Sequence, residues 1–292
     1  MRVPISWLKD YIDVDIPLEE LTRKLTMAGI EVSSIETVGE SWSSIFVGEV
    51  IELAPHPNAD RLKLATINFG KEPVSVVCGA PNISQGQRVA FAMTGANLID
   101  PDTHEPTQLK PARIRGVLSE GMICSELELG IGESHLGIMI LPEDAPIGIQ
   151  LSDYLGDKVL DLEITSNRPD CLSVLGIAHE IAALTGSSVK ESVIEYPELG
   201  EAIDGQIQVD VKNSDLCPRY MASLIRNVTI KPSPMWLQSR LRNVGLRPIN
   251  NVVDITNYIL HETGHPLHAF DIVNIDGDKV IVSTVKNKTK FI

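Results

Sequence analysis

The stretch from Arg247 to Asp271 holds the densest set of side chains that could bind or act on a polar ligand. Its sequence, RPINNVVDITNYILHETGHPLHAFD, places three histidines, three asparagines, two aspartates and two prolines around short apolar runs. The runs VVDI and NYIL are too short for capped surface helices, and Gly264 with Pro266 predicts a turn just before His268. Polar side chains on loops between apolar strands commonly form binding sites. We therefore expect a polar pocket here, and histidines without a role, in the core or at the surface, are the alternative.

His261 to His265 spells HETGH, which matches the H-E-x-x-H pattern of zinc proteases. That motif binds zinc only when both histidines lie one turn apart on an unbroken helix, with the glutamate beside them as general base. Gly264 lies between the two histidines and Pro266 follows, so we expect the helix to end inside the motif. A zinc hydrolase is therefore the least favoured interpretation, and no metal ligand is assigned.

The 292-residue chain, with 43% apolar residues, is long enough for two or three folded domains. No apolar run approaches the roughly 20 residues that cross a bilayer, and the start, MRVPISWLKDY, lacks the apolar stretch of a signal peptide. These features predict a cytoplasmic protein without membrane contact. The cysteines are far apart and lack C-x-x-C spacing, which predicts reduced, mostly buried thiols at Cys78, Cys124, Cys171 and Cys217.

The formal net charge of −14 excludes indiscriminate binding of nucleic acid through bulk positive charge, because the phosphates would be repelled. The segment from Val211 to Asn250 differs, since seven basic residues and one acidic residue, Asp215, give a local balance of +6. This segment predicts a basic patch, and the alternative is a solvated face whose arginine stems cover apolar surface. The basic residues are Lys212, Arg219, Arg226, Lys231, Arg240, Arg242 and Arg247.

Two helices are predicted from apolar spacing. The first lies in PLEELTRKLTMAGIEV, begins at Pro17 and is closed by Gly29; its apolar positions are Leu18, Leu21, Leu25 and Ala28. The second lies in DLEITSNRPDCLSVLGIAHEIAALTG, with Asp170 as N-cap and Gly186 just past its end; its apolar face is Leu175, Ala178, Ile181 and Ala182. His179 on this helix is interpreted as a bystander rather than a ligand.

Residues 40–150 have a different sequence pattern. They contain short β-rich segments bounded by Gly, Pro or Asn, such as IFVGEVIEL, LKLATINFG, VSVVCGA and RVAFAMTG. Such segments predict a small barrel. We expect this barrel to be inserted in a discontinuous α/β domain of residues 1–39 and 151–200. The acidic stretch 191–205 predicts a linker, and residues 201–292 begin a further domain. The expected fold class is a multidomain α+β chain.

Residues 40–150 contain the motifs PHPNADRLKLA, CGAPNI and SEGMICSELELG. Together these three motifs resemble the tRNA-binding OB module found as an appendage on several synthetase systems. OB folds bind nucleic acid on one barrel face through basic side chains and loops. The resemblance makes Arg61, Lys63, Arg113 and Arg115 the candidates for tRNA contact. The segment has seven basic and fourteen acidic residues, a net charge of −7, which disfavours binding of phosphates. The alternative is therefore that the barrel has only a structural role.

Four motifs occur in order along the whole chain: VPISWLKDYI, then PNADRLKLA with CGAPNI and GMICSELELG, then SNRPDCLSVLGIAHEIA, and then RPINNVVDITNYILHETGHPLHAFD. Together they resemble the beta subunit of bacterial phenylalanyl-tRNA synthetase. The resemblance implies an OB-fold barrel, and it implies that residues 201–292 are the first part of a mixed α/β editing domain of the B3/B4 type. It also implies an N-terminal fragment, because that family's beta subunits are much longer and this chain stops in KVIVSTVKNKTKFI, inside a predicted strand.

The resemblance further implies partners and an activity, that of a phenylalanine-tRNA ligase. Members of the family pair with an alpha subunit in a heterotetramer of two alpha and two beta subunits. The alpha subunit carries ATP, phenylalanine and the ligase chemistry with Mg²⁺, so no cofactor is expected in this fragment. The beta subunit helps to bind tRNA(Phe) and hosts a site that hydrolyses tyrosine wrongly attached to that tRNA.

An editing site has a physical reason. Phenylalanine and tyrosine differ by one hydroxyl, and an apolar pocket rejects an added hydroxyl by only about a hundredfold. A second site can form a hydrogen bond with that hydroxyl. Phenylalanine would leave the buried polar groups of this site unpaired, so it binds there weakly and is not hydrolysed from the tRNA.

By the resemblance, Thr256, Asn257 and His268 fall on editing-pocket positions, and Arg247 is a weaker candidate for contact with the tRNA end. His268 is the candidate catalytic residue, which orients the attacking water or holds the terminal adenosine, because imidazole side chains in general titrate near neutral pH. The family's pocket also uses an acidic residue further downstream, so we do not expect the fragment alone to edit. The rival interpretation is a free-standing, non-enzymatic tRNA-binding or assembly module in which the barrel acts and the histidine stretch only folds.

Overall fold

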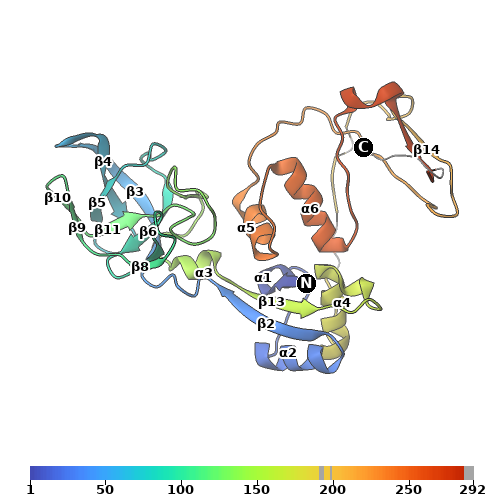
Figure 1. Cartoon of the computed structure of the whole chain (residues 1–292), viewed down its shortest axis with the longest axis horizontal. Helices are drawn as coiled ribbons and strands as arrows, with labels where there is room; N and C mark the ends of the chain where they lie inside the picture. Colours follow the sequence, from blue (N-terminus) through green and yellow to red (C-terminus); the bar gives the residue numbers. More distant parts are fainter. Residues whose placement is uncertain (191–193, 198, 286–292) are drawn as a thin grey trace.

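The computed structural model describes residues 1–190, 194–197 and 199–285, and its elements form three groups (Figure 1). The first group is built on a three-stranded antiparallel sheet in the order β1-β13-β2. Strand β13, which follows the barrel segment in sequence, lies between two strands that precede it. The strands are β1 (Arg2–Pro4), β2 (Glu31–Val38) and β13 (Asp157–Glu163).

Helices α1 (Ile5–Leu8), α2 (Leu18–Met27) and α4 (Val174–Thr185) share a single hydrophobic core with this sheet. The fully buried side chains of that core come from both sides of the barrel segment, and include Trp7, Leu21, Leu25, Leu160, Ile177 and Ile181. The start of the chain and the segment after the barrel therefore fold on each other.

The predicted amino-terminal helix is confirmed as α2. Leu21 and Leu25 are fully buried, whereas Ala28 is exposed and is the C-cap. Pro17 is the N-cap, and Gly29 follows the helix with a φ of 92°. This left-handed conformation is the one that favours glycine after a helix.

Helix α4 ends where the sequence predicts but begins later than Asp170. Its N-cap is Ser173, whose Oγ accepts a hydrogen bond from the Gly176 N–H at 2.9 Å. Asp170 instead forms an ion pair of 2.9 Å with Arg168, so the prediction of Asp170 as N-cap is wrong. Gly186, with a φ of 74°, is confirmed as the C-cap.

The second group is a six-stranded antiparallel sheet that nearly closes into a barrel, consistent with an OB-like domain. Its strand order is β11-β6-β3-β4-β5, and β12 also pairs with β6. The Val77 N–H donates to Ser119 Oγ at 3.1 Å, which draws β5 toward the segment before β11. The strands are β3 (Ile45–His56), β4 (Ala59–Asn68), β5 (Val74–Cys78), β6 (Arg88–Met93), β11 (Gly121–Ile123) and β12 (Ile140–Leu141).

Strand β6 separates two hydrophobic cores. Ala90 and Ala92 belong to one, and Val89 and Phe91 to the other, as expected when alternate side chains of a strand point to opposite faces. Two short hairpins extend from the sheet, and helix α3 leads from the barrel to β13 (Figure 1). These elements are β7 (Asn97–Ile99) with β8 (Pro106–Gln108), β9 (Ala112–Ile114) with β10 (Val117–Ser119), and α3 (Leu151–Leu155).

The third group contains helices α5 (Met235–Asn243) and α6 (Asn251–Thr263) and a parallel pair of strands, β14 (Gln208–Val211) and β15 (Lys279–Val282). Two 3₁₀ turns precede β15, at Ile272–Asn274 and Asp276–Asp278. The expected linker 191–205 and the end of the predicted final strand lie partly outside the described residues.

Helix α6 corrects the expectation that VVDI and NYIL are too short for a capped helix, because both runs join one helix of 13 residues. The Asn250 side chain accepts hydrogen bonds from the Val252 and Val253 N–H groups, both at 3.1 Å. Gly264 ends the helix with a φ of 80°. An asparagine N-cap and a glycine after the last turn are strong helix boundaries, so residues interpreted as loop are the caps of the helix.

Across the described ranges, no helix combines the length and the apolar character needed to cross a membrane. All four cysteines are free, and Cys78, Cys124 and Cys171 are buried. The prediction of reduced, mostly buried thiols is confirmed. His179 is exposed on α4, in keeping with the role of a bystander.

Candidate functional site

Helix α6 carries two of the expected pocket residues, Thr256 and Asn257, outside the row of side chains formed by Asp254, Tyr258 and Glu262. Asp254, Tyr258 and Glu262 follow one another at intervals of four and therefore share one face of the helix. Thr256 and Asn257 lie between them in sequence and are both partly exposed. The Thr256 hydroxyl donates to a carbonyl oxygen of its own helix, that of residue 253, at 2.7 Å.

His268 lies in the exposed segment after α6. Its ring centroid is 6.5 Å from that of Phe270. Within the described ranges, no hydrogen bond joins His268 to Thr256 or Asn257. The structure therefore holds Thr256 and Asn257 together on one helix and presents His268 separately, on the chain that leaves it.

The HETGH motif is divided between a helix and a loop. His261 lies in the last turn of α6, where burial lowers its pKa, and His265 is exposed beyond the helix. Gly264 ends the helix between them, which confirms that the helix ends inside the motif. Glu262 accepts hydrogen bonds from two tyrosines. In the part of the chain that the structure describes, no group of three or more His, Cys, Asp or Glu residues is placed to bind a metal ion.

The hairpin β9–β10 docks on the connection between β3 and β4. Its turn consists of Arg115 and Gly116, with φ values of 50° and 93°. The Asn58 side-chain amide donates to the Arg115 carbonyl oxygen at 3.0 Å, and His56 Nε2 lies 3.2 Å from the Ile114 carbonyl oxygen. These contacts fix the position of the hairpin tip relative to the start of β4.

The four candidate tRNA contacts lie on these two neighbouring segments. Arg61, Arg113 and Arg115 are exposed, and Lys63 is partly buried with its Nζ 3.3 Å from the Ile83 carbonyl oxygen. None of the four forms an ion pair with any residue that the structure describes. Three guanidinium groups are therefore available to solvent beside the β3–β4 connection.

Four of the seven basic residues in the segment 212–247 form ion pairs within the chain, whereas Arg219, Arg226 and Lys231 are exposed and form none with the described residues. Arg240 also lies over aromatic rings, so the alternative of an arginine stem that covers apolar surface describes this residue better than a free basic patch. The Arg247 side chain is 84% exposed and forms only a long contact, 3.7 Å, with the Glu133 carboxylate. The pairs are Lys212–Asp210, Arg240–Asp10, Arg242–Glu126 and Arg247–Glu133.

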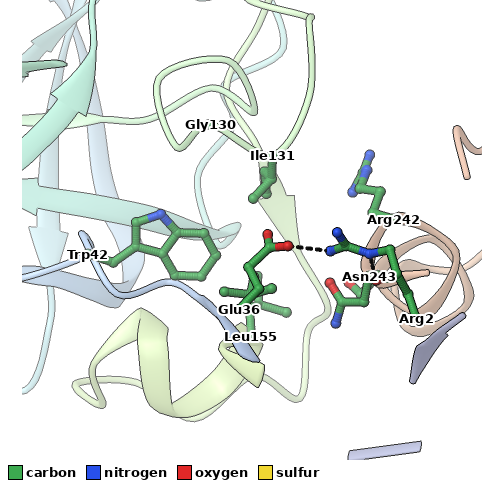
Figure 2. A pocket seen from close by; sticks show the side chains of 10 residues that line it. Arg2, Glu36, Trp42, Gly130, Ile131, Leu155, Arg242 and Asn243 are labelled. Atoms are coloured by element: carbon green, nitrogen blue, oxygen red, sulfur yellow. Dashed lines mark hydrogen bonds and ion pairs between the residues drawn. The ribbon is translucent and has the colours of Figure 1, made fainter. Parts of the chain in front are cut away.

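A cavity of about 160 Å³ lies where the first group, the barrel and helix α5 meet (Figure 2). Arg2 donates to Glu36 at 2.6 Å and to the Asn243 carbonyl oxygen at 2.9 Å on one side of it, and Trp42 lines the other side. Sequence reasoning missed this place, because its residues come from distant segments without a shared motif. Since Arg2 and Arg242 are both already paired, we assign no ligand to the cavity.

Two family models match the chain. The model described as "Putative tRNA binding domain" matches residues 45–150, and the model described as "B3/4 domain" matches residues 216–292. The first covers the barrel, and the second covers α5, α6 and the segment with His268.

Similar proteins match along the whole chain. The phenylalanine–tRNA ligase beta subunit of Dehalococcoides mccartyi is 46% identical over 282 residues, which are 97% of this chain and 35% of the relative. The beta subunit of Syntrophus aciditrophicus is 47% identical over 294 residues, 100% of this chain and 36% of the relative. That of Salinibacter ruber is 42% identical over 304 residues, 100% of this chain and 37% of the relative. The chain thus spans little more than a third of the length of these curated relatives, and it belongs to the family of phenylalanine–tRNA ligase beta subunits.

Proposed function

We propose that this chain is part of a beta subunit that contributes to the ATP-dependent attachment of phenylalanine to tRNA(Phe). The supporting observation is the 46–47% identity along 97–100% of the chain. In this proposal an alpha subunit binds ATP and phenylalanine and performs the ligase reaction. The two subunits assemble as a cytoplasmic heterotetramer of two alpha and two beta chains.

In this proposal Mg²⁺ acts with ATP on the alpha subunit, as the resemblance to the family implies. Mg²⁺ in such sites is bound through carboxylates together with substrate phosphates. The contribution proposed for this chain comes from its polar and basic side chains.

We propose that residues 40–150 form an OB-fold domain, inserted in a domain of residues 1–39 and 151–200, that contacts tRNA(Phe). Exposed and unpaired cations can release counterions from a phosphate backbone, which is the main source of affinity for nucleic acid. Arg61, Arg113 and Arg115 meet this condition, and Lys63 is nearby. Because the barrel segment has a net charge of −7, the contact is local rather than spread over the domain.

We propose that residues 201–292 contribute part of a site that removes tyrosine from mischarged tRNA(Phe). Asn257 and Thr256 would line the pocket for the amino acid, with the amide of Asn257 able to bond the tyrosine hydroxyl. His268 would orient the water that attacks the ester or hold the terminal adenosine, and Arg247 would contact the tRNA end. Two features support these roles: Thr256 and Asn257 are partly exposed on a capped helix, and His268 is exposed on the segment that follows.

The test uses a full-length beta subunit that contains this chain, purified with its alpha subunit. We expect the complex to charge tRNA(Phe) with phenylalanine and to deacylate Tyr-tRNA(Phe). Asn257→Ala and His268→Ala should slow deacylation by at least tenfold and leave charging unchanged, because the two reactions use different sites. The measurements are aminoacylation and deacylation rates with radiolabelled amino acids.

His265→Ala is the matched control, since His265 is an exposed histidine on the same segment, and it should deacylate at the wild-type rate. Loss of deacylation in this variant as well would mean that the segment matters only for folding. Normal deacylation in His268→Ala would remove His268 from the site. The chain alone, without the rest of the beta subunit, should not deacylate Tyr-tRNA(Phe).

A second function, a non-enzymatic tRNA-binding or assembly module, is favoured by one observation, the unpaired arginines of the barrel. Such a module would bind tRNA tightly as the isolated chain, with log K falling steeply against log salt. Weak binding by the isolated chain, together with deacylation by the full complex, would reject the module in favour of the editing proposal.

A further inference from the structure

Helix α6 is attached to the start of the chain by stacked aromatic rings and one arginine, which we call the aromatic–arginine anchor (Trp7, Trp236, Arg240 and Tyr258). The Trp7 and Tyr258 rings are stacked, with centroids 4.6 Å apart and planes 15° from parallel. Trp236 meets Tyr258 edge-on at 5.6 Å. The Arg240 guanidinium lies 5.4 Å from the Trp7 ring centroid and 6.0 Å from that of Tyr258. Segments about 250 residues apart in sequence are thereby held in one contact.

Polar contacts continue the anchor on both sides of the rings. Arg240 forms an ion pair of 2.6 Å with Asp10 and donates to the Tyr258 hydroxyl at 3.1 Å. The Tyr258 hydroxyl donates to Glu262 at 2.8 Å, and Tyr11 donates to the same carboxylate. Both hydroxyls are thus oriented by one glutamate on α6, and the charge of Arg240 is matched by a carboxylate of the first group.

The anchor fixes the rotation of α6 about its axis. Tyr258 and Glu262 are one helical turn apart. Tyr258 contacts Trp7 of the first group and Arg240 of α5, and Glu262 accepts a hydrogen bond from Tyr11 of the first group. In a helix each residue advances by about 100°, so Thr256 points away from Tyr258 and Asn257 lies at the flank. A helix held by one face presents its other side chains at defined positions. Without this contact, the bonds of Asp254 to Ser233 and Ile249 still hold the start of α6, but the face with Tyr258 and Glu262 loses its attachment to the first group.

We propose that Trp7 and Arg240 are positioning residues for the editing pocket: they hold α6 so that Thr256 and Asn257 face the aminoacyl end of the tRNA. The inference rests on the proposed editing function and assigns a role in it to the amino-terminal segment, which is far from the pocket residues in sequence. Neither residue touches the substrate. Their effect is on geometry, and misplacement of a reacting group by about 1 Å is enough to slow a reaction by about a hundredfold.

The experiment uses the full-length beta subunit in complex with its alpha subunit. Trp7→Ala should lower kcat for deacylation of Tyr-tRNA(Phe) by tenfold or more with little change in KM, because the pocket is misplaced while the tRNA is still bound. Charging with phenylalanine should continue at the wild-type rate. Trp7→Phe keeps a ring against Tyr258 and should restore at least half of the deacylation rate. The near-ultraviolet circular dichroism of the stacked pair should be lost in Trp7→Ala and partly kept in Trp7→Phe.

Arg240→Met and Arg242→Met form a matched pair on helix α5. Their side chains are similarly buried, 21% and 19% exposed, but Arg240 joins the anchor whereas Arg242 pairs with Glu126 of the barrel. Arg240→Met should slow deacylation by several-fold, and Arg242→Met should not. This pair also supplies the test if Trp7→Ala does not fold.

The outcomes separate the two proposals. If the wild-type complex does not deacylate Tyr-tRNA(Phe), the proposed function itself fails. If the wild type deacylates and both Trp7→Ala and Arg240→Met do so at the same rate, the positioning role is overturned. Equal losses of charging and deacylation in these variants would also overturn it, because they indicate a general loss of structure.

Discussion

Asp254 has no exposed surface, yet its carboxylate accepts hydrogen bonds from Ser233 Oγ at 2.5 Å and from the Ile249 N–H at 2.7 Å. It lies in the first turn of α6, where the helix dipole favours a negative charge. Buried polar groups are tolerated when such bonds are made. Asp254 thus ties the segments on both sides of α5 to the start of α6. From sequence it was one polar residue of a candidate pocket, and the structure gives it a role in folding.

Asp254→Ala should therefore lower the free energy of unfolding by about 1–3 kcal/mol, because it leaves the buried Ser233 hydroxyl and the part-buried Ile249 N–H without their acceptor. Urea denaturation followed by circular dichroism measures the change. Asp15→Ala removes a carboxylate from an exposed position and should change the free energy by no more than about 0.5 kcal/mol. Equal effects of the two substitutions would show that the bonds of Asp254 contribute nothing.

Tyr258 predicts a dependence of stability on alkaline pH. Burial, together with the hydrogen bond to Glu262, raises the pKa of Tyr258 to about 12. The folded chain then keeps this proton at pH values where the unfolded chain, with a tyrosine pKa near 10, has lost it. The stabilisation is fully present below about pH 10 and is lost as the pH rises toward 12. The difference in unfolding free energy between wild type and Tyr258→Phe should shrink over this window, and a constant difference would contradict the assignment.

At the scale of elements, local signals in the sequence correctly predicted both ends of α2 and the carboxyl ends of α4 and α6. The spacing of Leu21 and Leu25 predicted α2, and Gly186 and Gly264 marked the ends of α4 and α6. Errors arose at polar residues whose types are common in more than one kind of local structure. Asp170 was assigned as a cap but pairs with Arg168. The caps of α6 were assigned to a loop, because asparagine is common both in turns and at helix starts.

The hairpin β9–β10 carries a prediction about tRNA binding. In the full complex, Arg113→Ala and Arg115→Ala should each weaken binding of tRNA and reduce the slope of log K against log salt by about 1, as expected for loss of one phosphate contact. Fluorescence anisotropy at several salt concentrations gives both quantities. Arg23→Ala removes the same charge from an exposed position on α2 and should leave the slope unchanged. An unchanged slope in the hairpin variants would leave the barrel with a purely architectural role.

At the scale of the whole molecule, contacts between distant segments decide what the chain can do, and these the sequence could not predict. Nothing in the residues around Trp7 indicates that its ring stacks on Tyr258. The basic segment 212–247 was expected as a patch, yet two of its arginines connect α5 to the first group and to the barrel. Exposed arginines without an ion pair also lie on the barrel, although that segment is the more acidic of the two. Charge counted along the sequence is therefore a poor guide until the partners of each charge are known.

Exposed apolar side chains are concentrated in the third group, and they predict how the chain behaves alone. Leu216, Met221, Ile225 and Val273 are 70–82% exposed, and large exposed apolar patches favour association. We expect the isolated chain to self-associate with rising concentration, as measured by analytical ultracentrifugation. Because the contact is apolar, 1 M NaCl should not disperse the oligomers, whereas it would screen a charge-driven contact.

A combined Met221→Ser and Ile225→Ser variant should shift this equilibrium toward the monomer. Met27→Ser removes an equally exposed side chain, 78% exposed, from the first group and should have no effect, because the core of that group is already closed. If both variants associate like the wild type, the contact lies outside the third group. Self-association confined to the third group would instead identify the apolar surface that is covered in the assembled protein, in agreement with our expectation that the chain alone does not deacylate Tyr-tRNA(Phe).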